Sequence, residues 1–336
     1  MDAGSRRILA LIPGRSHDPA MPPATPFSSS APVRHPTLER TLMVGYQGWF
    51  RVPNDRSGMQ WDHYQTRTNQ FQPGTDTQPE FLNIDYWPAV DELPATVRQA
   101  TPFSLADGAT AEVFTSFHSD TIDLHFEWMR QHGIDGAFVQ RFAVELLDPK
   151  TVAQIDQVLA WELAAAEKAG CSVAVMYDLS GFPHATLEAV LADWQRLTTD
   201  PKLKLTQSPA YQHHRGRPLV GVWGVGFDDG RAYSLAEIGR LLNSLRDVAG
   251  GCSLLAGVAS GWRTARDWRS AQTDATNDTA LPGLLARVDV ISPWTPGRFE
   301  DLGQARIFAE TNWRPDLAWC KARGVDYLPV VFPGFS

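Results

Sequence analysis

Four segments of the chain share one pattern, in which an amphipathic helix ends at a glycine and a short apolar strand begins at once. The segments are "RQHGIDGAFVQRF", "EKAGCSVAVMYD", "VAGGCSLLAGVAS" and "KARGVDYLPVVF", with the helix-ending glycines at Gly133, Gly170, Gly251 and Gly324. A left-handed glycine at this position satisfies free carbonyl groups of the last helical turn. The strands are apolar throughout, which is typical of parallel strands covered on both faces. The pattern therefore predicts an α/β fold with a parallel sheet.

Seven strands fit this pattern, with helices in most of the intervals between them. They are expected at residues 42–47, 135–142, 172–178, 218–226, 252–259, 288–292 and 326–332. Alternating strands and helices in a chain of 336 residues fit a (β/α)8 TIM barrel best. An extended stretch at 112–117 would raise the count to eight. It lies in a long irregular insertion after the first strand, so we count seven and predict a barrel truncated before its eighth strand.

The segment "SDTIDLHFEWMRQHG" is one of the predicted helices between the strands. Asp120 is the expected N-cap, because an aspartate side chain there accepts backbone N–H groups of the first turn. Ile122, Phe126 and Met129 recur at helical spacing and are expected to face the sheet.

The composition excludes several classes of function. A net charge of −8 and the absence of a basic stripe argue against nucleic acid as a partner. No apolar run reaches the ~20 residues that span a bilayer. The three cysteines, Cys171, Cys252 and Cys320, lack the C-x-x-C spacing of a zinc site and are odd in number, so we expect buried thiols and no metal. No dinucleotide motif with the required spacing occurs, and we expect no cofactor.

The first 39 residues differ in composition from the rest. They are rich in proline, serine and alanine, as in "PAMPPATPFSSSAPVRHP", and are expected to form a disordered leader or linker. "RRILALIPG" has an apolar run of only five residues, short of the ~7–15 of a signal peptide. The barrel is expected to occupy residues 40–336.

Aromatic, amide and charged residues gather where the predicted strands end, which is where TIM barrels carry their chemistry. These candidates for ligand binding are Tyr46, Gln47, Trp49, Gln140, Arg141, Tyr177, Asp178, Trp223, Trp262 and Trp294. Flat rings that stack on sugars, together with polar groups that recognise hydroxyls, suit a neutral carbohydrate. Each tryptophan also fits a core position, and Asp178 also fits a structural ion pair with Arg141.

The loop after the first strand adds two candidates, His63 in "WDHY" and Asp85 in "NIDYWP". Both are possible sugar ligands. His63 fits an ordinary surface histidine equally well, and Asp85 fits a turn or helix cap ahead of Trp87 and Pro88.

Several of these segments resemble the glycoside hydrolase family 71/99-like proteins, some of them described as xylosidases or arabinosidases and related to endo-α-mannosidases. The similar segments are "MVGYQGWF", "FHSDTIDLHFEWMRQHGIDGAFVQRF", "VAVMYDLSG" and "YLPVVFPGFS", from about residue 40 onward. The resemblance implies a (β/α)8 barrel, hydrolysis of an oligo- or polysaccharide, and a secreted or periplasmic location. It also implies an acidic sugar-binding residue at Asp178 and an eighth strand that carries two carboxylates.

Glycoside hydrolysis generally needs two carboxylates that flank the scissile bond. Asp178 is the catalytic candidate in this chain, and its partners are expected on the missing strand. Two alternatives remain open. One is a non-catalytic carbohydrate-binding barrel, and the other is a complete TIM-barrel hydrolase that uses Asp178 with Asp228 or Asp229. The sequence leaves open the sugar, the linkage, the stereochemical outcome and the oligomeric state.

Overall fold

The structure is a computed structural model of the chain that describes residues 36–65, 70–181, 187–265 and 274–332. The chain divides into the units Met1–Ser30 and Ala31–Ser336, and every described residue belongs to the second unit. Most of the predicted leader, residues 1–35, lies outside the described residues, as do residues 333–336.

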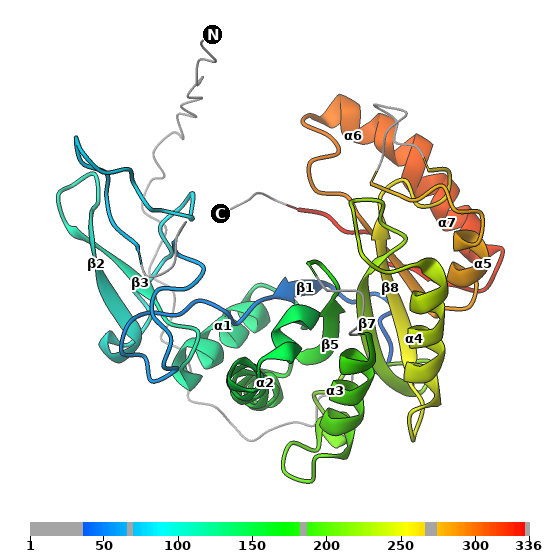
Figure 1. Ribbon diagram of the computed structural model, residues 1–336, viewed down its shortest axis with the longest axis horizontal. Coiled ribbons are helices and arrows are strands. Elements are labelled where there is room, and N and C mark those ends of the chain that lie inside the picture. Colours follow the sequence, from blue (N-terminus) through cyan, green and yellow to red (C-terminus); the bar gives the residue numbers. More distant parts are fainter. Residues whose placement is uncertain (1–35, 66–69, 182–186, 266–273, 333–336) are drawn as a thin grey trace. The chain divides into compact units, whose positions relative to one another are not determined.

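A parallel sheet of seven strands is the centre of the described unit (Figure 1). In order across the sheet they are β1 (Met43–Tyr46), β4 (Gly136–Phe142), β5 (Ser172–Asp178), β7 (Arg217–Val225), β8 (Ser253–Ala259), β9 (Val290–Trp294) and β10 (Asp326–Tyr327). A short strand, β6 (His213–His214), pairs antiparallel with the start of β7. The seven predicted strands are thus confirmed, and their order in space follows their order in the sequence.

The last strand is shorter than the predicted 326–332. Only Asp326 and Tyr327 form a ladder with β9. Leu328 N–H still donates to the Ile291 carbonyl at 2.9 Å, and the Thr295 hydroxyl donates to the Val330 carbonyl. The chain therefore follows β9 after the regular strand has ended.

The sheet is open between β1 and β10. β1 forms its ladder with β4, and β10 with β9, while no ladder among the described residues joins β1 to β10. β3 (Thr110–Phe114) pairs antiparallel with β2 (Arg98–Ser104) in a separate two-stranded sheet. The prediction that 112–117 does not form a barrel strand is confirmed, and the described sheet resembles a (β/α)8 barrel that lacks one strand.

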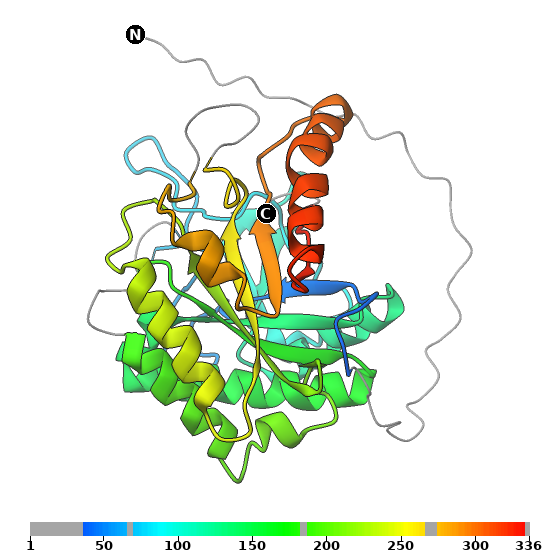
Figure 2. The ribbon, with the colours of Figure 1, turned by 90° about the vertical axis from the view of Figure 1, so that its right-hand side faces the viewer.

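Helices follow most strands and cover the outer face of the sheet (Figures 1 and 2). They are α1 (Ser119–Gln131), α2 (Pro149–Ala169), α3 (Leu187–Thr199), α4 (Leu235–Asp247), α5 (Leu281–Leu285), α6 (Leu302–Phe308) and α7 (Arg314–Lys321). Short 3-10 helices occur at η1 (Ala95–Val97), η2 (Ala143–Leu147) and η4 (Leu205–Gln207), and a short π-helix, η5 (Ala309–Trp313), joins α6 to α7. None of the described helices has both the length and the apolar character to cross a membrane.

The helix ends agree with the sequence at the C-terminal side and differ at one N-terminus. The four predicted C-terminal glycines all have positive φ, between 65° and 75°. The N-cap of α1 is His118, not Asp120, because the imidazole of His118 accepts the Asp120 N–H at 3.2 Å. Any side-chain acceptor at this position can cap the helix by accepting the N–H two residues later, and an imidazole nitrogen does so as a carboxylate would.

Alternating residues of each strand face two different cores. The outer core lies between the sheet and the helices, and contains the predicted stripe of Ile122, Phe126 and Met129. The inner core fills the concave side of the sheet, with Phe138, Met176 and other buried residues from successive strands. All three cysteines are buried free thiols, as predicted. The period of two along each strand therefore decides which side chains reach the concave face.

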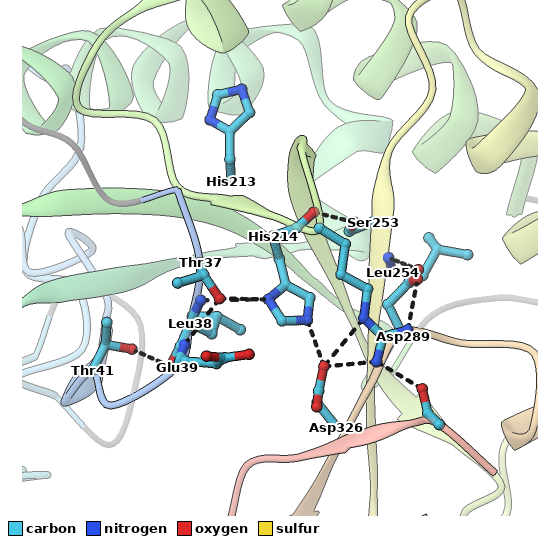
Figure 3. Close-up of polar contacts among 12 residues, drawn as sticks. Thr37, Leu38, Glu39, Thr41, His213, His214, Ser253, Leu254, Asp289 and Asp326 are labelled. Atoms are coloured by element: carbon cyan, nitrogen blue, oxygen red, sulfur yellow. Dashed lines mark hydrogen bonds and ion pairs between the residues drawn. The ribbon is translucent and has the colours of Figure 1, made fainter.

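Residues just before β1 close the N-terminal end of the sheet. Leu38 is buried in the inner core, and its N–H donates to Nδ1 of His214 at 3.4 Å (Figure 3). The other ring nitrogen of His214 bonds to Oδ2 of Asp326 in β10 at 2.9 Å. Since Nδ1 accepts, Nε2 carries the proton and donates to Asp326. One imidazole thus connects the chain that enters β1 to the edge strand on the other side of the sheet.

Candidate functional site

A chain of three polar side chains crosses the C-terminal ends of three neighbouring strands. Nε2 of Gln47, just after β1, donates to Oε1 of Gln140 in β4, and Nε2 of Gln140 donates to Oδ2 of Asp178 in β5 at 2.5 Å. The second oxygen of Asp178 accepts the Ser180 N–H at 2.8 Å. Asp178 is 5% exposed. The structure therefore brings Gln47, Gln140 and Asp178 together, with both carboxylate oxygens bonded and the side chain on the concave face.

Two tryptophans continue this surface along the next strands. Trp223 in β7 lies opposite Asp178 in the strand register, and its ring contacts that of Trp294 in β9 with centroids 5.4 Å apart and planes at 78°. The Trp223 ring lies over Gly257 of β8, where an added Cβ would be only 2.1 Å from a ring carbon. Gly257 thus leaves the space that lets the indole lie flat against the sheet.

A second aromatic group stands beside β4. The ring of Trp49 stacks on His63 with centroids 3.9 Å apart and on Phe142 with centroids 5.3 Å apart. Phe142 is the last residue of β4 and pairs in register with Asp178. Burial lowers the pKa of His63, so its ring is neutral at neutral pH. Phe142 was missed by the sequence analysis, although it shares the period of two with Phe138 and Gln140.

Three predicted ligands point the other way, to the helices. The guanidinium of Arg141 pairs with Asp193 at 2.9 Å and Asp156 at 3.0 Å, and the Tyr177 hydroxyl donates to Asp193 at 2.8 Å. Tyr46 bonds to Nδ1 of His125 in α1 at 2.7 Å. Each of these residues is next in sequence to a residue on the concave face. Because neighbouring side chains in a strand point to opposite faces, each of the three points to the helix-covered outer face. Their assignment as ligands is corrected, and the partner of Arg141 is Asp193, not Asp178.

Trp262 is also a core residue. It is 2% exposed, its indole N–H donates to Oδ2 of Asp316 at 3.1 Å, and its ring packs edge-on against Trp319 at 4.9 Å. Asp316 lies in α7, on the outer side of the sheet. The assignment of Trp262 to the sugar-binding surface is therefore corrected.

The remaining acidic candidates lie on exposed loops. Asp85 is exposed ahead of β2, and no contact among the described residues joins it to the polar chain. Asp229 is exposed and forms a bidentate pair with Arg231 at 2.8 and 2.9 Å. Asp228 is exposed, and its N–H donates to the Asp274 carbonyl. Of the acidic candidates from the sequence, Asp178 alone belongs to the polar chain.

The part of the chain that the structure describes contains no group of three or more histidine, cysteine, aspartate or glutamate side chains that could hold a metal ion. What the concave face offers instead is an amide–carboxylate chain between two aromatic groups. Such a surface can exchange hydrogen bonds with hydroxyl groups and cover apolar ring faces at the same time.

The sequence matches no protein-family model and no curated protein. Two similar solved structures are both of the glycoside hydrolase family 99 (GH99) endo-α-mannosidase from Bacteroides thetaiotaomicron, one of them in complex with bis-tris propane. The complex is 15% identical over 89% of this chain and 71% of that chain, and the other structure 16% identical over 89% and 73%, both with a TM-score of 0.52. The chain therefore has the fold of the GH99 endo-α-mannosidases, which confirms, at the level of the fold, its resemblance to the glycoside hydrolase family 71/99-like proteins.

Proposed function

We propose that the concave face binds a carbohydrate chain and that the protein is a glycoside hydrolase of oligo- or polysaccharides. The observation that carries the proposal is the Gln47–Gln140–Asp178 chain beside the Trp223–Trp294 pair, on a sheet with the fold of a glycosidase. This combination suits a neutral polyhydroxylated ligand better than an anion, because the polar chain consists of two amides and a carboxylate and includes no basic side chain.

Asp178 is the central residue of the proposed site. Its oxygens are held by Gln140 and by the Ser180 N–H, which fixes the carboxylate as an acceptor. A sugar hydroxyl that donates to it would complete a network of nearly buried polar groups. Such networks discriminate strongly, because a ligand without the hydroxyl leaves a desolvated acceptor unpaired. In this proposal Asp178 binds the sugar hydroxyl, or assists catalysis through it.

Cleavage requires an acid and a second carboxylate as base or nucleophile. We propose that this pair lies on an eighth strand between β1 and β10, because no ladder among the described residues joins these two strands. The C-terminal end of such a strand would lie next to that of β1, which is followed by Gln47. The proposal assigns binding to the described strands and proton transfer to the eighth.

Isothermal titration calorimetry with α-linked mannotriose and a panel of xylo- and arabino-oligosaccharides tests the binding function. Asp178→Asn is expected to weaken the binding of the preferred oligosaccharide at least tenfold, which is about 1.4 kcal/mol. Asp229→Asn is the matched control, because Asp229 is an exposed aspartate bound to Arg231. Unchanged affinity in a folded Asp178→Asn variant, or an equal loss in Asp229→Asn, contradicts the assigned role.

A second candidate is a non-catalytic carbohydrate-binding barrel. It is favoured by one observation, that the polar chain on the concave face contains a single carboxylate. Binding without release of reducing ends, in a chain that includes an eighth strand, would support this candidate over hydrolysis.

A further inference from the structure

Glu162 is a buried acid whose carboxyl group lacks a partner. It lies in α2, is 1% exposed, and neither of its oxygens has a hydrogen-bond partner among the described residues. Asp193 and Asp316, the other buried acids of the outer side, are both paired with arginines. A buried carboxyl without a partner is costly, so it calls for a physical explanation.

A small cavity lies against this carboxyl. Its volume is about 40 Å3, and it is bounded by the loop from Gln47 to Arg51 on one side and by α2 on the other, with Arg141 and Glu162 in its wall. Nη1 of Arg141 also lacks a partner among the described residues. A polar cavity of this size is large enough for ordered water, which could bridge the Glu162 carboxyl and Nη1 of Arg141.

The same carboxyl supports the backbone that carries two residues of the proposed site. A Cβ added to Gly48 would lie 2.5 Å from Cγ1 of Val158 and 3.1 Å from Oε1 of Glu162, so both side chains of α2 pack closely against the Gly48 backbone. Gly48 separates Gln47 from Trp49. Nη1 of Arg51 donates to the Gly48 carbonyl at 2.7 Å and to the Phe50 carbonyl at 3.1 Å. Arg51 therefore binds the loop through two hydrogen bonds, while Val158 and Glu162 pack against it at Gly48.

The charges around Glu162 come from several elements. Arg51 in the loop and Arg141 in β4 favour its ionised form, but burial outweighs both and raises the pKa of Glu162 to about 8. Burial raises the pKa of the Tyr46 hydroxyl in β1, and the negative charge of an ionised Glu162 raises it further. The same cavity is lined by Asp62 and by Glu145 of η2, whose pKa is raised by burial. At neutral pH the Glu162 carboxyl is therefore protonated.

We propose that Glu162 is a positioning residue that, as the neutral acid, holds Gln47 and Trp49 in place, and that loss of its proton to water in the cavity releases them. The neutral acid leaves Arg51 bound to the carbonyls of Gly48 and Phe50. An ionised Glu162 competes with those carbonyls for the guanidinium and draws water under Gly48. The part that concerns ligand binding rests on the proposed function, and the movement of the loop does not.

Fluorine NMR of protein labelled with 5-fluorotryptophan tests the loop without any ligand. The Trp49 resonance is assigned with Trp49→Phe and followed from about pH 6 to about pH 9.5, a range that covers the raised pKa of a buried carboxyl. We expect one transition near pH 8 in the wild-type protein, the same transition in the control Glu167→Gln, and none in Glu162→Gln. Glu167 lies on the same helix and accepts a hydrogen bond from Ser208.

The proposal is overturned if the wild-type Trp49 resonance shows no transition while circular dichroism reports an intact fold. It is also overturned if the transition persists in Glu162→Gln. A second experiment measures oligosaccharide affinity by calorimetry at different pH values. The affinity of the wild type is expected to fall at least fivefold between pH 7 and pH 9.5, and that of Glu162→Gln to stay constant. Absence of oligosaccharide binding at every pH would contradict the proposed function alone, since the Trp49 resonance still reports on the loop.

Discussion

At the scale of residues, the pleat of the strands decides which side chains can meet a ligand. Gln140 reaches the concave face and its neighbour Arg141 is buried against α2 and α3, although both end the same strand. In the next strand Asp178 likewise reaches the concave face, whereas Tyr177 points to the outer side and bonds to Asp193. The sequence identified the right strand ends but could not by itself choose between adjacent residues, because the strands are apolar on both faces. The positions of Phe138 and Phe142 relative to Gln140 would have been the usable signal.

The tryptophans also divide between the two faces of the sheet, with Trp223 and Trp294 on the concave face and Trp262 in the outer core. Trp223→Ala is expected to weaken oligosaccharide binding at least tenfold, because it removes the ring beside Asp178 and its contact with Trp294. Trp319→Phe, in the outer core against Trp262, is the control and should lower stability without changing affinity. Calorimetric titration of both variants checks this, and equal affinity of Trp223→Ala and wild type would return Trp223 to a purely structural role.

Glu162 also makes a prediction for stability. Its pKa is about 8 in the folded protein and near the ordinary value of ~4.3 in the unfolded chain. A raised folded pKa contributes stability that is complete below the unfolded pKa and is lost as pH rises through the folded pKa. The wild type therefore loses stability as pH rises from about 4.5 to about 8, whereas Glu162→Gln does not. The free energy of unfolding of Glu162→Gln relative to that of the wild type is expected to rise over this range by a few kcal/mol.

Urea unfolding of Glu162→Gln and wild type at several pH values measures this difference. Glu167→Gln again serves as the control, because its carboxyl lies outside the cavity. A difference between Glu162→Gln and wild type that does not change with pH would mean that Glu162 is not the titrating group.

At the scale of elements, the sequence predicted most of the fold. The four helix-ending glycines and the apolar strands after them are local signals, and both are found where expected. The α1 N-cap at His118 was missed because an imidazole is an uncommon acceptor there. The length of β10 was overestimated, because the number of residues in a strand depends on its pairing with β9, which the sequence does not display.

The connection through His214 is an element-scale feature that no local pattern predicts. It links residues 37–38, β6 and β10 through one buried ring (Figure 3). His214→Ala is expected to lower the free energy of unfolding by about 1–3 kcal/mol, because the buried Leu38 N–H loses its acceptor. His213→Ala is the control, since His213 is half-buried and its imidazole bonds to the nearby Tyr211 carbonyl two residues away. Equal losses in the two variants, measured by urea unfolding, would contradict a special role for His214.

At the scale of the whole molecule, the open sheet is the dominant feature. No strand among the described residues pairs with the outer edge of β1 or of β10, and an edge of this kind can pair with other chains. A chain that carries an eighth strand with two carboxylates is expected to associate less and to hydrolyse oligosaccharide, whereas residues 1–336 alone should self-associate. Light scattering with a reducing-end assay on both chains tests this. Hydrolysis by residues 1–336 at the rate of the longer chain would refute the assignment of the acids to an eighth strand.

The central claim is that carbohydrate binds on the concave face at the C-terminal ends of β4, β5 and β7. A crystal structure of the protein soaked with α-linked mannotriose, or with whichever oligosaccharide binds best in calorimetry, tests it most directly. The account predicts a sugar ring against Trp223 with a hydroxyl within hydrogen-bond distance of Asp178. A sugar bound elsewhere, with Asp178 bonded only to Gln140 and Ser180, would contradict it.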